Sequence, residues 1–485
     1  MWLGFGKAVQ HWGTYAPDKI AIRIGSSSYN YSTFYQRSLM YVNYLLKRRI
    51  RGRIGIAASS NFEYLSAIAG AKIIGNPVII MNPLESKESL KVHIADTTPE
   101  IIFGNKELIK SVNPEMGVEI IDCEEISVNE DMPQSPIKTD EWGVLFSSGS
   151  TGISKAIIYN HETLTSELLA WVLELGITRN SKFYIGRPIS YTGGLVLSLA
   201  TLLVGGEVLY PIEKTFIDFD KIFKDYCRTI SEYIIDYAFF VPDQLRYFCN
   251  QNQIHIPVPP KTPTILVMGA KITANEKIEA HKKLHSDIIE SWGNTEGLGT
   301  ITDKGDLKNR PESIGRPFLT EDIYIVNDEF EKCPENQNGR LAGSDETMFV
   351  EYANRPDATS YVKNNHLILS DDIGYKDKDG YFYILGRVQE SFVIGKKTVF
   401  LTDLEDKIRV VEGIEDVCVI SITKKSNPVF AAIIVKKTSA GKDRIIEHIN
   451  KKTDVQFDVF NFVNELPRLS SGKINRLKVS QGIVL

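Results

Sequence analysis

The sequence predicts an α/β protein, in which a large N-terminal domain of stacked, mostly parallel sheets and helices precedes a small α+β C-terminal domain. Short apolar runs of strand length alternate with helical patterns through most of the chain, which is typical of parallel sheets covered by helices. The chain has 485 residues, more than the roughly 250–300 that one hydrophobic core accommodates. We therefore expect several core units with room for a cleft between them.

The N-terminal elements are predicted from their apolar segments. PVIIMN at 77–82 and EIIFGN at 100–105 have the length of strands, whereas NFEYLSAIAGAKIIG at 61–75 has the length and pattern of a helix. Apolar residues on one face predict a further helix over 164–175, and Gly176 supplies its C-terminal stop. Because such strands and helices alternate, the sheets are expected to be largely parallel.

A separate unit begins after YILGR at 383–387. VCVISIT and PVFAAIIVK are strand-like, and KDRIIEHINKKT is helical, so the pattern restarts on a smaller scale. About 100 residues suffice for an independent domain. We predict one domain over residues 1–387 and a second over 388–485, with a candidate hinge at the junction.

Composition and charge exclude several classes of function. The 56 basic and 61 acidic residues are well mixed and give a net charge of −5, so no basic field for nucleic acid is predicted. Five scattered cysteines without CxxC spacing indicate reduced thiols in the cytoplasm.

The best apolar run, at 195–204, is about half of a membrane span, and no signal peptide is recognisable. His281 and His285 have metal-ligand spacing without a third ligand, so no zinc is predicted.

The segment SSGSTGISKAII at 147–158 is the first candidate site. It follows the strand-like WGVLF, and its glycines allow backbone N–H groups to converge on an anion while hydroxyls and a lysine add donors. The pattern GxxxxGK[ST] does not fit, and on composition alone an ordinary turn is an equally good interpretation. The residues predicted to bind phosphate are Ser147, Ser148, Gly149, Ser150, Thr151, Gly152 and Lys155.

The order of these residues resembles a known pattern, [ST]SG[ST]TGxPKG. This is the phosphate loop of the adenylate-forming superfamily, which includes acyl-CoA synthetases, nonribosomal peptide adenylation domains and luciferase. Ser154 stands in place of the proline and Ala156 in place of the last glycine.

Further motifs of that superfamily follow in its order. SWGNTEG at 291–297 resembles YGxTE, and SIGRP at 313–317 is similar to the next element. The segment from YANRPDATS to YILGR follows the GY…TGDxxxxDxDGxxxxxGR pattern, with Ser370 and Asp371 replacing Thr-Gly. LPRLSSGKINR at 466–476 matches PxTxxGKxxR. The resemblance covers essentially the whole chain and is greatest to acyl-CoA synthetases.

The resemblance implies attack of a carboxylic acid on the α-phosphate of ATP, with release of pyrophosphate and formation of acyl-AMP. Lys473 would bridge the acid and the α-phosphate, and Glu296 with Thr151 would bind Mg²⁺ as further catalytic groups. Trp292 would stack on adenine, and Asp372 would accept the ribose hydroxyls. The remaining nucleotide-binding residues implied by the resemblance are Gly293, Asn294, Thr295 and Arg387.

A second half-reaction is implied by the same resemblance. The C-terminal domain of these enzymes rotates after adenylation and brings a glycine-containing segment to a thiol tunnel. Gln389 stands at the hinge position, and Gly395 is kept in the tunnel segment, where Lys396 replaces a second glycine. The acyl group would pass to coenzyme A. The alternative acceptor is a separate acyl carrier protein, because no carrier domain is attached.

The acyl pocket is expected around RPISYTGGL at 187–195 and VMGAKI at 267–272. No aspartate stands nearby to pair with a substrate ammonium, so an apolar fatty or aryl acid is favoured over an amino acid. The predicted substrate-binding residues are Tyr191, Gly193, Gly194 and Gly269. The substitutions in several motifs leave a non-catalytic nucleotide-binding relative as an alternative, against which the retained acidic residues and lysines argue.

Overall fold

The structure is a computed structural model of the whole chain. It describes residues 4–105, 108, 117–127, 137–147, 154–212, 216, 218–251, 256–344, 350–364, 366–394, 397–421, 429–437, 441–468 and 474–482.

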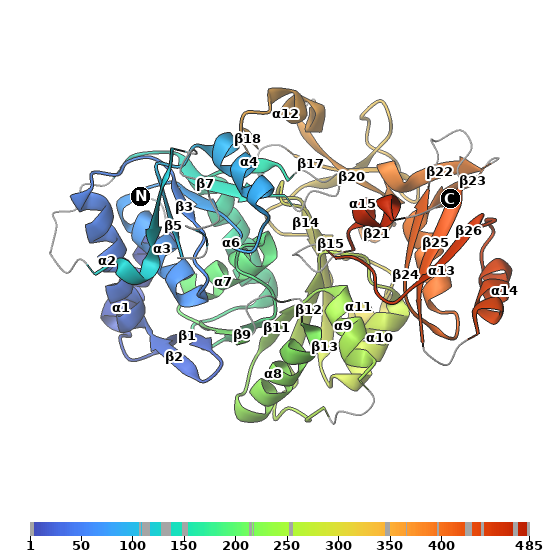
Figure 1. Cartoon of the computed structure of the whole chain (residues 1–485), viewed down its shortest axis with the longest axis horizontal. Coiled ribbons are helices and arrows are strands. Elements are labelled where there is room, and N and C mark those ends of the chain that lie inside the picture. The colour runs from blue at the N-terminus through green and yellow to red at the C-terminus, as the bar shows by residue number, and fades with distance from the viewer. Residues whose placement is uncertain are drawn as a thin grey trace.

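Two large sheets form the framework of the N-terminal part (Figure 1). One runs in the order β18-β8-β7-β4-β3-β5-β6, the other in the order β15-β14-β13-β12-β11-β9-β10-β1-β2. Their central strands are parallel, and the antiparallel strands β8, β18, β14, β15 and β2 stand toward the edges. The strands of the seven-stranded sheet are β3 (Ile54–Ile56), β4 (Val78–Ile80), β5 (Ile101–Gly104), β6 (Glu119–Asp122), β7 (Glu141–Phe146), β8 (Ala156–Asn160) and β18 (Glu351–Tyr352).

The nine-stranded sheet is built from segments spread over some 300 residues of sequence. Its strands are β1 (Ile20–Ile24), β2 (Ser27–Asn30), β9 (Lys182–Ile185), β10 (Glu207–Tyr210), β11 (Tyr237–Phe240), β12 (Thr264–Met268), β13 (Asp287–Gly293), β14 (Gly299–Ile301) and β15 (Arg316–Pro317).

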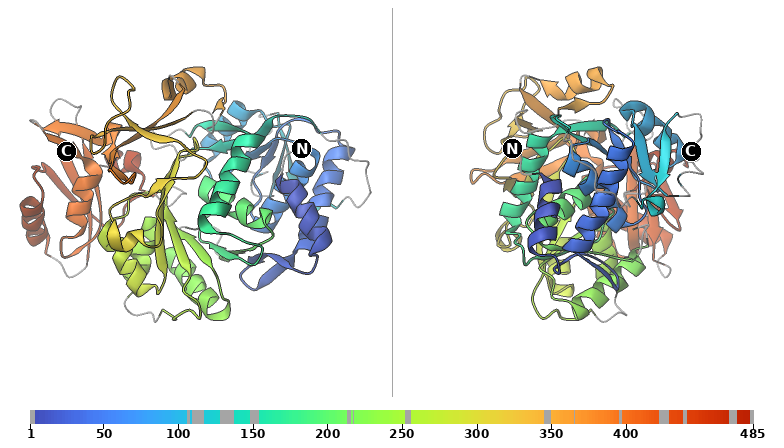
Figure 2. Two further views of the ribbon diagram at one scale, coloured as in Figure 1. Left: turned by 180° about the vertical axis from the view of Figure 1, so that it is seen from behind. Right: turned by 90° about the vertical axis from the view of Figure 1, so that its left-hand side faces the viewer.

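Helices separate and cover these two sheets (Figure 2). One core cluster joins β3 through Ile56, α3 through Leu65, α7 through Leu197 and β9 through Phe183. Other clusters pack α4 on the outer face of the seven-stranded sheet and α8, α9 and α10 on the outer face of the nine-stranded sheet. The result is an αβαβα order of layers. The helices are α1 (Phe5–Tyr15), α2 (Tyr31–Lys47), α3 (Asn61–Ile74), α4 (Lys87–Thr97), α6 (His161–Leu175), α7 (Thr192–Leu203), α8 (Phe219–Glu232), α9 (Pro242–Cys249), α10 (Ala274–Lys283), α11 (Asp306–Asn309) and α12 (Pro356–Val362), with a 3₁₀ turn η2 (Cys123–Glu125).

The predicted helices follow their sequence signals. The expected helix at 164–175 is α6, whose N-cap Asn160 accepts a hydrogen bond from the backbone of Thr163 and which ends at Gly176 in the left-handed conformation. The apolar run at 195–204 lies largely in α7, which is buried over most of its length. This run is therefore a core helix, as predicted.

A third, antiparallel sheet lies between the large sheets and the C-terminal part (Figure 1). Its path is β16-β17-β20-β19, and β21 pairs with β20. The strands are β16 (Ile323–Val326), β17 (Gly339–Ser344), β19 (Lys363–Asn364), β20 (Leu367–Lys376) and β21 (Phe382–Arg387).

The chain after residue 387 forms its own sheets and cores. Two core clusters contain only residues from 392–479. The sheet β24-β25-β26 carries the helices, and β22 pairs with β23. The elements are η3 (Val388–Glu390), β22 (Ser391–Ile394), β23 (Lys397–Phe400), α13 (Leu401–Arg409), β24 (Ile414–Ser421), β25 (Phe430–Lys436), α14 (Lys442–Lys452), β26 (Val459–Val463) and α15 (Arg476–Gln481). The predicted α/β class, with a smaller α+β unit at the end, is confirmed.

Across the part of the chain that the structure describes, every helix is too short or too polar to cross a lipid bilayer.

Steric constraints explain why the SIGRP segment has a glycine at position 315. Gly315 has a φ of +89°, and a Cβ placed on it would lie 1.9 Å from the carbonyl oxygen of Ile301. Gly176 also has a positive φ, of +66°, but faces open space. Of these two glycines, Gly315 alone combines a left-handed backbone with a close backbone contact.

We predict that Gly315→Ala lowers the free energy of unfolding by about 2–5 kcal/mol, because it adds a clash to the backbone strain. Gly176→Ala is the matched control and should cost about 1 kcal/mol from strain alone. Urea unfolding followed by circular dichroism measures both. Equal losses in the two variants would contradict the steric explanation.

Candidate active site

The base of the segment 147–155 is closed by two hydrogen bonds. The backbone N–H of Ser147 donates to the carbonyl oxygen of Lys155 at 3.0 Å, and the backbone N–H of Lys155 donates to Ser147 Oγ at 3.0 Å. The antiparallel pair β7 and β8 therefore ends in a fixed base at these two residues. The predicted phosphate-binding residues Ser148, Gly149, Ser150, Thr151 and Gly152 lie outside the described residues.

Lys155 and Glu296 both contact Tyr352, the lysine over the ring and the carboxylate at the hydroxyl. Lys155 Nζ lies 4.8 Å from the centroid of the Tyr352 ring, and the Tyr352 hydroxyl donates to Glu296 Oε1 at 2.5 Å. Burial raises the pKa of Tyr352, and the charge and hydrogen bond of Glu296 add to this shift. The phenol therefore stays protonated and a donor. A predicted phosphate-binding cation and a predicted metal-binding carboxylate thus share one neighbour.

Two tyrosines of the seven-stranded sheet attach it to the segment 292–297 of the nine-stranded sheet. Tyr352 on β18 binds Glu296, and Tyr159 on β8 donates its hydroxyl to the carbonyl oxygen of Thr295. Both tyrosine side chains are almost completely buried. The segment itself turns tightly after β13, because the backbone N–H of Asn294 donates to Leu298 O at 3.0 Å.

Gly293 begins this turn. A Cβ on Gly293 would lie 2.9 Å from the carbonyl oxygen of Leu298, so glycine allows the two strands to approach closely. Gly293, Asn294, Thr295 and Glu296 are therefore held as one rigid turn between the two sheets.

Trp292, Asp372 and Arg387 form a second group of predicted residues. Trp292 Nε1 donates to Asp372 Oδ2 at 3.1 Å, and Arg387 Nε lies 3.4 Å from Asp372 Oδ1. Asp372 on β20 and Arg387 on β21 are direct cross-strand partners. Burial by itself lowers the pKa of Arg387, but Asp372 and Glu390 raise it by more, so the guanidinium remains charged.

Asp372 keeps acceptor capacity in this arrangement. An ionised carboxylate offers about four lone-pair sites, and the indole and guanidinium occupy one side of each oxygen. The carboxylate is thus oriented by two donors and can accept further hydroxyl groups.

The predicted acyl-binding residues lie at the start of α7. Tyr191 is the N-cap of this helix, and its hydroxyl accepts a hydrogen bond from Asn82 Nδ2 at 3.2 Å. A Cβ on Gly193 would meet Met268 and Phe239, whereas a Cβ on Gly194 would lie 2.3 Å from the carbonyl oxygen of Pro188.

These contacts show that the two glycines have different steric environments. Gly193 faces side chains that can move, whereas Gly194 is required by a close backbone approach. Gly269 follows β12 with a φ of +105°, which explains a glycine there.

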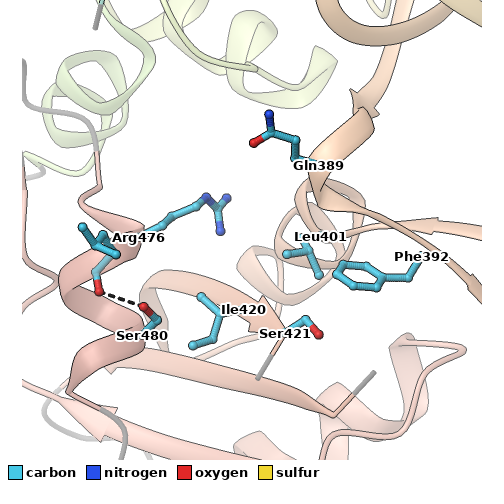
Figure 3. Close-up of a pocket in the computed structure, with 8 residues that line it drawn as sticks. Gln389, Phe392, Leu401, Ile420, Ser421, Arg476 and Ser480 are labelled. Atoms are coloured by element: carbon cyan, nitrogen blue, oxygen red, sulfur yellow. Dashed lines mark hydrogen bonds between the residues drawn. The ribbon is translucent and has the colours of Figure 1, made fainter. Parts of the chain in front are cut away.

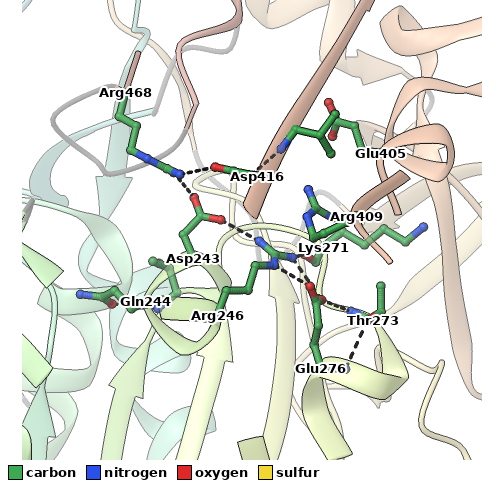
Figure 4. A network of polar contacts seen from close by, with 12 residues as sticks. Asp243, Gln244, Arg246, Lys271, Thr273, Glu276, Glu405, Arg409, Asp416 and Arg468 are labelled. Atoms are coloured by element: carbon green, nitrogen blue, oxygen red, sulfur yellow. Dashed lines mark hydrogen bonds and ion pairs between the residues drawn. The ribbon is translucent and has the colours of Figure 1, made fainter. Parts of the chain in front are cut away.

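The C-terminal part contacts α9 and the segment after β12 through partly buried ion pairs (Figure 4). Arg468 lies between Asp243 on α9 and Asp416 on β24, and its Nη2 donates to Asp416 at 2.6 Å. Lys271, just after β12, pairs with Asp406 on α13 at 2.8 Å. Burial alone would raise the pKa of Asp243, but Arg246 and Arg468 hold it below its usual value. The Asp243 carboxylate therefore stays ionised and remains paired with both arginines.

Arg468 also stands at the described end of the segment that contains the predicted catalytic lysine. Arg468 and Ile474 form an antiparallel bridge, and the backbone N–H of Asn475 donates to Pro467 O at 2.7 Å. Lys473 precedes Ile474 in the chain but lies outside the described residues, as does Gly395. The base of the turn is nevertheless tied to α9 through Asp243.

An open pocket of about 270 Å³ lies on the C-terminal part and includes the predicted hinge residue Gln389 in its lining (Figure 3). Gln389 and Arg476 point into it from different segments, and Phe392, Leu401 and Ile420 form apolar walls. Arg476 is held in place because it donates to the carbonyl oxygen of Val419 at 2.7 Å and pairs with Glu405.

Several of these residues were missed by the sequence analysis. Tyr159 and Asp243 stand in segments whose local pattern indicates only a strand or a helix start, whereas Tyr352 and Arg468 stand in the motif segments YANRPDATS and LPRLSSGKINR, where they were given no role. Their roles depend on partners 50 or more residues away, so no local spacing could have revealed them. Within the described residues, no cluster of three or more His, Cys, Asp or Glu side chains forms a metal site.

Comparison with known proteins places the chain in a family. Residues 9–353, well over half of the chain, match the model of the family described as AMP-binding enzyme. The chain therefore belongs to the AMP-binding enzyme family.

Two relatives extend over nearly the whole chain. The 2-succinylbenzoate–CoA ligase of Oceanobacillus iheyensis is 24% identical over 96% of this chain and 98% of its own length. An uncharacterised acyl–CoA ligase of Bacillus subtilis, YhfT, is 25% identical over 96% of this chain and 95% of its own. The predicted resemblance to the adenylate-forming superfamily and the predicted class, an AMP-forming acid–thiol ligase, are confirmed.

A solved structure shares the fold. O-succinylbenzoate coenzyme A synthetase from Bacillus subtilis, in complex with ATP and a magnesium ion, superimposes with a TM-score of 0.85 at 17% identity. The superposition covers 97% of this chain and 98% of that protein. The arrangement of sheets described above is therefore the fold of adenylate-forming enzymes.

We predict that Tyr352→Phe lowers the rate of acid-dependent exchange between ATP and pyrophosphate by about 10- to 100-fold, because a hydrogen bond to a charged group is lost. The Mg²⁺ concentration for half-maximal rate should rise with it. Tyr361→Phe, on the 63% exposed Tyr361 of α12, is the control and should be unchanged. A Tyr352→Phe variant with the wild-type rate and Mg²⁺ dependence would show that the contact with Glu296 is irrelevant to the reaction.

Proposed function

We propose that this protein activates a carboxylic acid with ATP and Mg²⁺ to an acyl-adenylate, and then transfers the acyl group to coenzyme A. The observation that carries the proposal is the meeting of Lys155 and Glu296 at Tyr352. It puts a cation and a carboxylate from different sheets beside the loop expected to hold phosphates. A polyphosphate with a divalent cation needs both charges within reach.

The residues suit a magnesium ion. Glu296 has a carboxylate with only one oxygen engaged by Tyr352 in the described contacts, and hard cations favour one or two carboxylates with phosphate oxygens. We assign Glu296, with Thr151, as the Mg²⁺-binding residues. A bound Mg²⁺ would neutralise charge on the pyrophosphate that leaves.

The nucleoside would lie beside Asp372. We assign this carboxylate to the ribose hydroxyls, because Trp292 and Arg387 fix its orientation and leave lone pairs available. The indole of Trp292 offers its face to adenine. Gly293, Asn294 and Thr295, in the turn held by Tyr159, would line the α-phosphate.

In the first step a carboxylate oxygen of the acid attacks the α-phosphorus. The new oxygen–phosphorus bond forms as the bond from the α-phosphorus to its bridging oxygen breaks, and pyrophosphate departs. Ser147 and Lys155, with the loop residues between them, would hold the leaving group. Lys473 would neutralise the charge that develops between acid and α-phosphate. The protein's task is positioning and charge neutralisation.

In the second step the sulfur of coenzyme A attacks the acyl carbon. The carbon–sulfur bond forms, the bond from the acyl carbon to the AMP oxygen breaks, and the thiol proton is released. We propose that residues 388–485 form a mobile domain that rotates about Gln389 between the two steps and brings the Gly395 segment to the site. A separate acyl carrier protein remains the alternative acceptor.

We propose an apolar fatty or aryl acid as substrate. The wall near Tyr191 and Gly193 contains Met268 and Phe239, whose side chains are apolar. Gly194 and Gly269 complete the predicted pocket. Free cysteines at all five positions are consistent with the cytoplasm as the place of the reaction.

One observation favours a second candidate, an acid with a further anionic group. Arg187 is 3% exposed at the end of β9, and its guanidinium lies 5.4 Å from the centroid of the Tyr191 ring. Burial lowers its pKa to about 10, which still leaves it charged near neutral pH. A buried positive charge beside the acyl pocket would stabilise a second carboxylate.

An exchange assay between ATP and labelled pyrophosphate with a panel of acids tests the proposal. The panel contains fatty acids, aryl acids and aryl acids with a second carboxylate. Exchange with any of them supports the ligase, and the preferred class decides between the two substrates. No exchange with any acid favours a non-catalytic nucleotide-binding protein. Coenzyme A is then added, and thioester formation decides the acceptor.

We predict that Lys473→Ala lowers the acid-dependent exchange rate by about 10²–10³, because a charge contact of the transition state is lost. Thioester formation from added acyl-adenylate should change by less than about threefold, since the lysine serves only the first step. Both rates are measured on the same preparation. A loss confined to the second step would reverse the assignment.

We predict that Arg468→Met lowers the exchange rate by about 10-fold or more, because breaking its contacts with two partly buried carboxylates detaches the described end of the Lys473 segment from α9. Lys451→Met, which removes the exposed pair with Glu447 on α14, is the control. Exchange and thioester formation are measured separately. Wild-type exchange in Arg468→Met would show that this ion pair does not position the lysine.

A further inference from the structure

Ser154, which replaces the proline of the family pattern, has a specific contact. Its Oγ lies 2.5 Å from Nε2 of His93, on helix α4. The imidazole of His93 is only 2% exposed, so the contact is shielded from water. Ser154 immediately precedes Lys155, whose backbone closes the base of the loop.

His93 also contacts the other end of the same loop. Its ring stacks on that of Phe146, with centroids 3.7 Å apart and an angle of 18° between the planes. Phe146 is the last residue of β7 and precedes Ser147. The imidazole of His93 therefore contacts Phe146, which precedes the segment 147–155, and Ser154, near the end of that segment.

A carboxylate lies near the other side of the imidazole, but neither Glu85 Oε2 nor His93 Nδ1 makes a hydrogen bond among the described residues. Glu85 Oε2 lies 3.1 Å from Nδ1 of His93. Burial lowers the pKa of His93 to about 4 against the attraction of Asp96, with Arg355 adding to the lowering, and burial raises the pKa of Glu85 to about 7. The imidazole is thus neutral near pH 7. Its effect on a phosphate loop is one of hydrogen-bond geometry rather than of charge.

We propose that His93 and Ser154 are positioning residues for the nucleotide, which hold the outgoing end of the phosphate loop and thereby the orientation of Lys155. Proline at this place restricts the backbone dihedral φ. The hydrogen bond between Ser154 and the buried, stacked imidazole of His93 instead restricts the position of the same segment. The proposal rests on the proposed function, because it assigns the loop to the phosphates of ATP.

The test compares Ser154→Ala with Ser154→Thr. The alanine variant should raise the KM for ATP by about 2- to 10-fold, the range for one hydrogen bond, without changing the KM for the acid. The threonine variant keeps the hydroxyl and should stay within twofold of wild type. Thermal melting should be the same in all three proteins. A general packing defect would instead lower the melting temperature and affect both substrates.

A double-mutant cycle with His93 examines the pair itself. His93→Leu removes the hydrogen bond, and His93→Gln keeps a donor near the position of Nε2. The effects of His93→Leu and Ser154→Ala on the KM for ATP should not add, because both remove one contact. His93→Gln should retain most of the wild-type affinity. If His93→Leu does not fold, the Ser154 variants alone decide.

A direct measurement of nucleotide binding tests this proposal independently of the proposed enzymatic activity. The dissociation constant of MgATP is measured by calorimetry, which needs no acid and no turnover. Ser231→Ala, which removes an exposed hydroxyl that donates to the carbonyl oxygen of Cys227 on α8, is the control for loss of a serine hydroxyl. Weaker binding in Ser154→Ala and not in Ser231→Ala supports the proposal. Equal affinity of Ser154→Ala and wild type, or additive effects in the cycle, overturns it, whatever the exchange assay shows.

Discussion

Two buried tyrosine hydroxyls join the two large sheets at the candidate active site. Tyr352 binds the carboxylate of Glu296, and Tyr159 binds the backbone of Thr295, so both fix the turn after β13 against strands β8 and β18. The predicted phosphate-binding segment adjoins one sheet, and the acidic segment adjoins the other. Without this joint the predicted cation and carboxylate would have no fixed separation, and the site could not be preorganised.

Specific polar contacts also hold the C-terminal part against the N-terminal part. Its described contacts with the N-terminal part include the ion pairs of Arg468 and Lys271, whereas its own cores are apolar. Apolar cores keep a unit intact, and polar contacts allow two units to separate. This contrast is consistent with the proposed rotation between two half-reactions. Arg468, which makes one of these ion pairs, stands at the described end of the segment that leads to Lys473.

The sequence was informative where the signal is local. Alternating strands and helices predicted the α/β class, and Gly176 marked a helix end that the structure confirms. Motif order predicted the family. The joint between sheets was not predictable, because Tyr352 and Glu296 are separated by 56 residues and Tyr159 and Thr295 by 136. Likewise Ser154 stood out only as a departure from a pattern, and its partner on α4 became visible only in the fold.

In the proposed first step, ATP is cleaved between its α- and β-phosphates when an acid is bound. This step can be followed with ATP labelled at the α-phosphate in the presence of Mg²⁺ and each acid, without coenzyme A. We expect label in acyl-AMP and AMP, equimolar pyrophosphate, and dependence on the acid. Label in ADP, with release of inorganic phosphate, would contradict it.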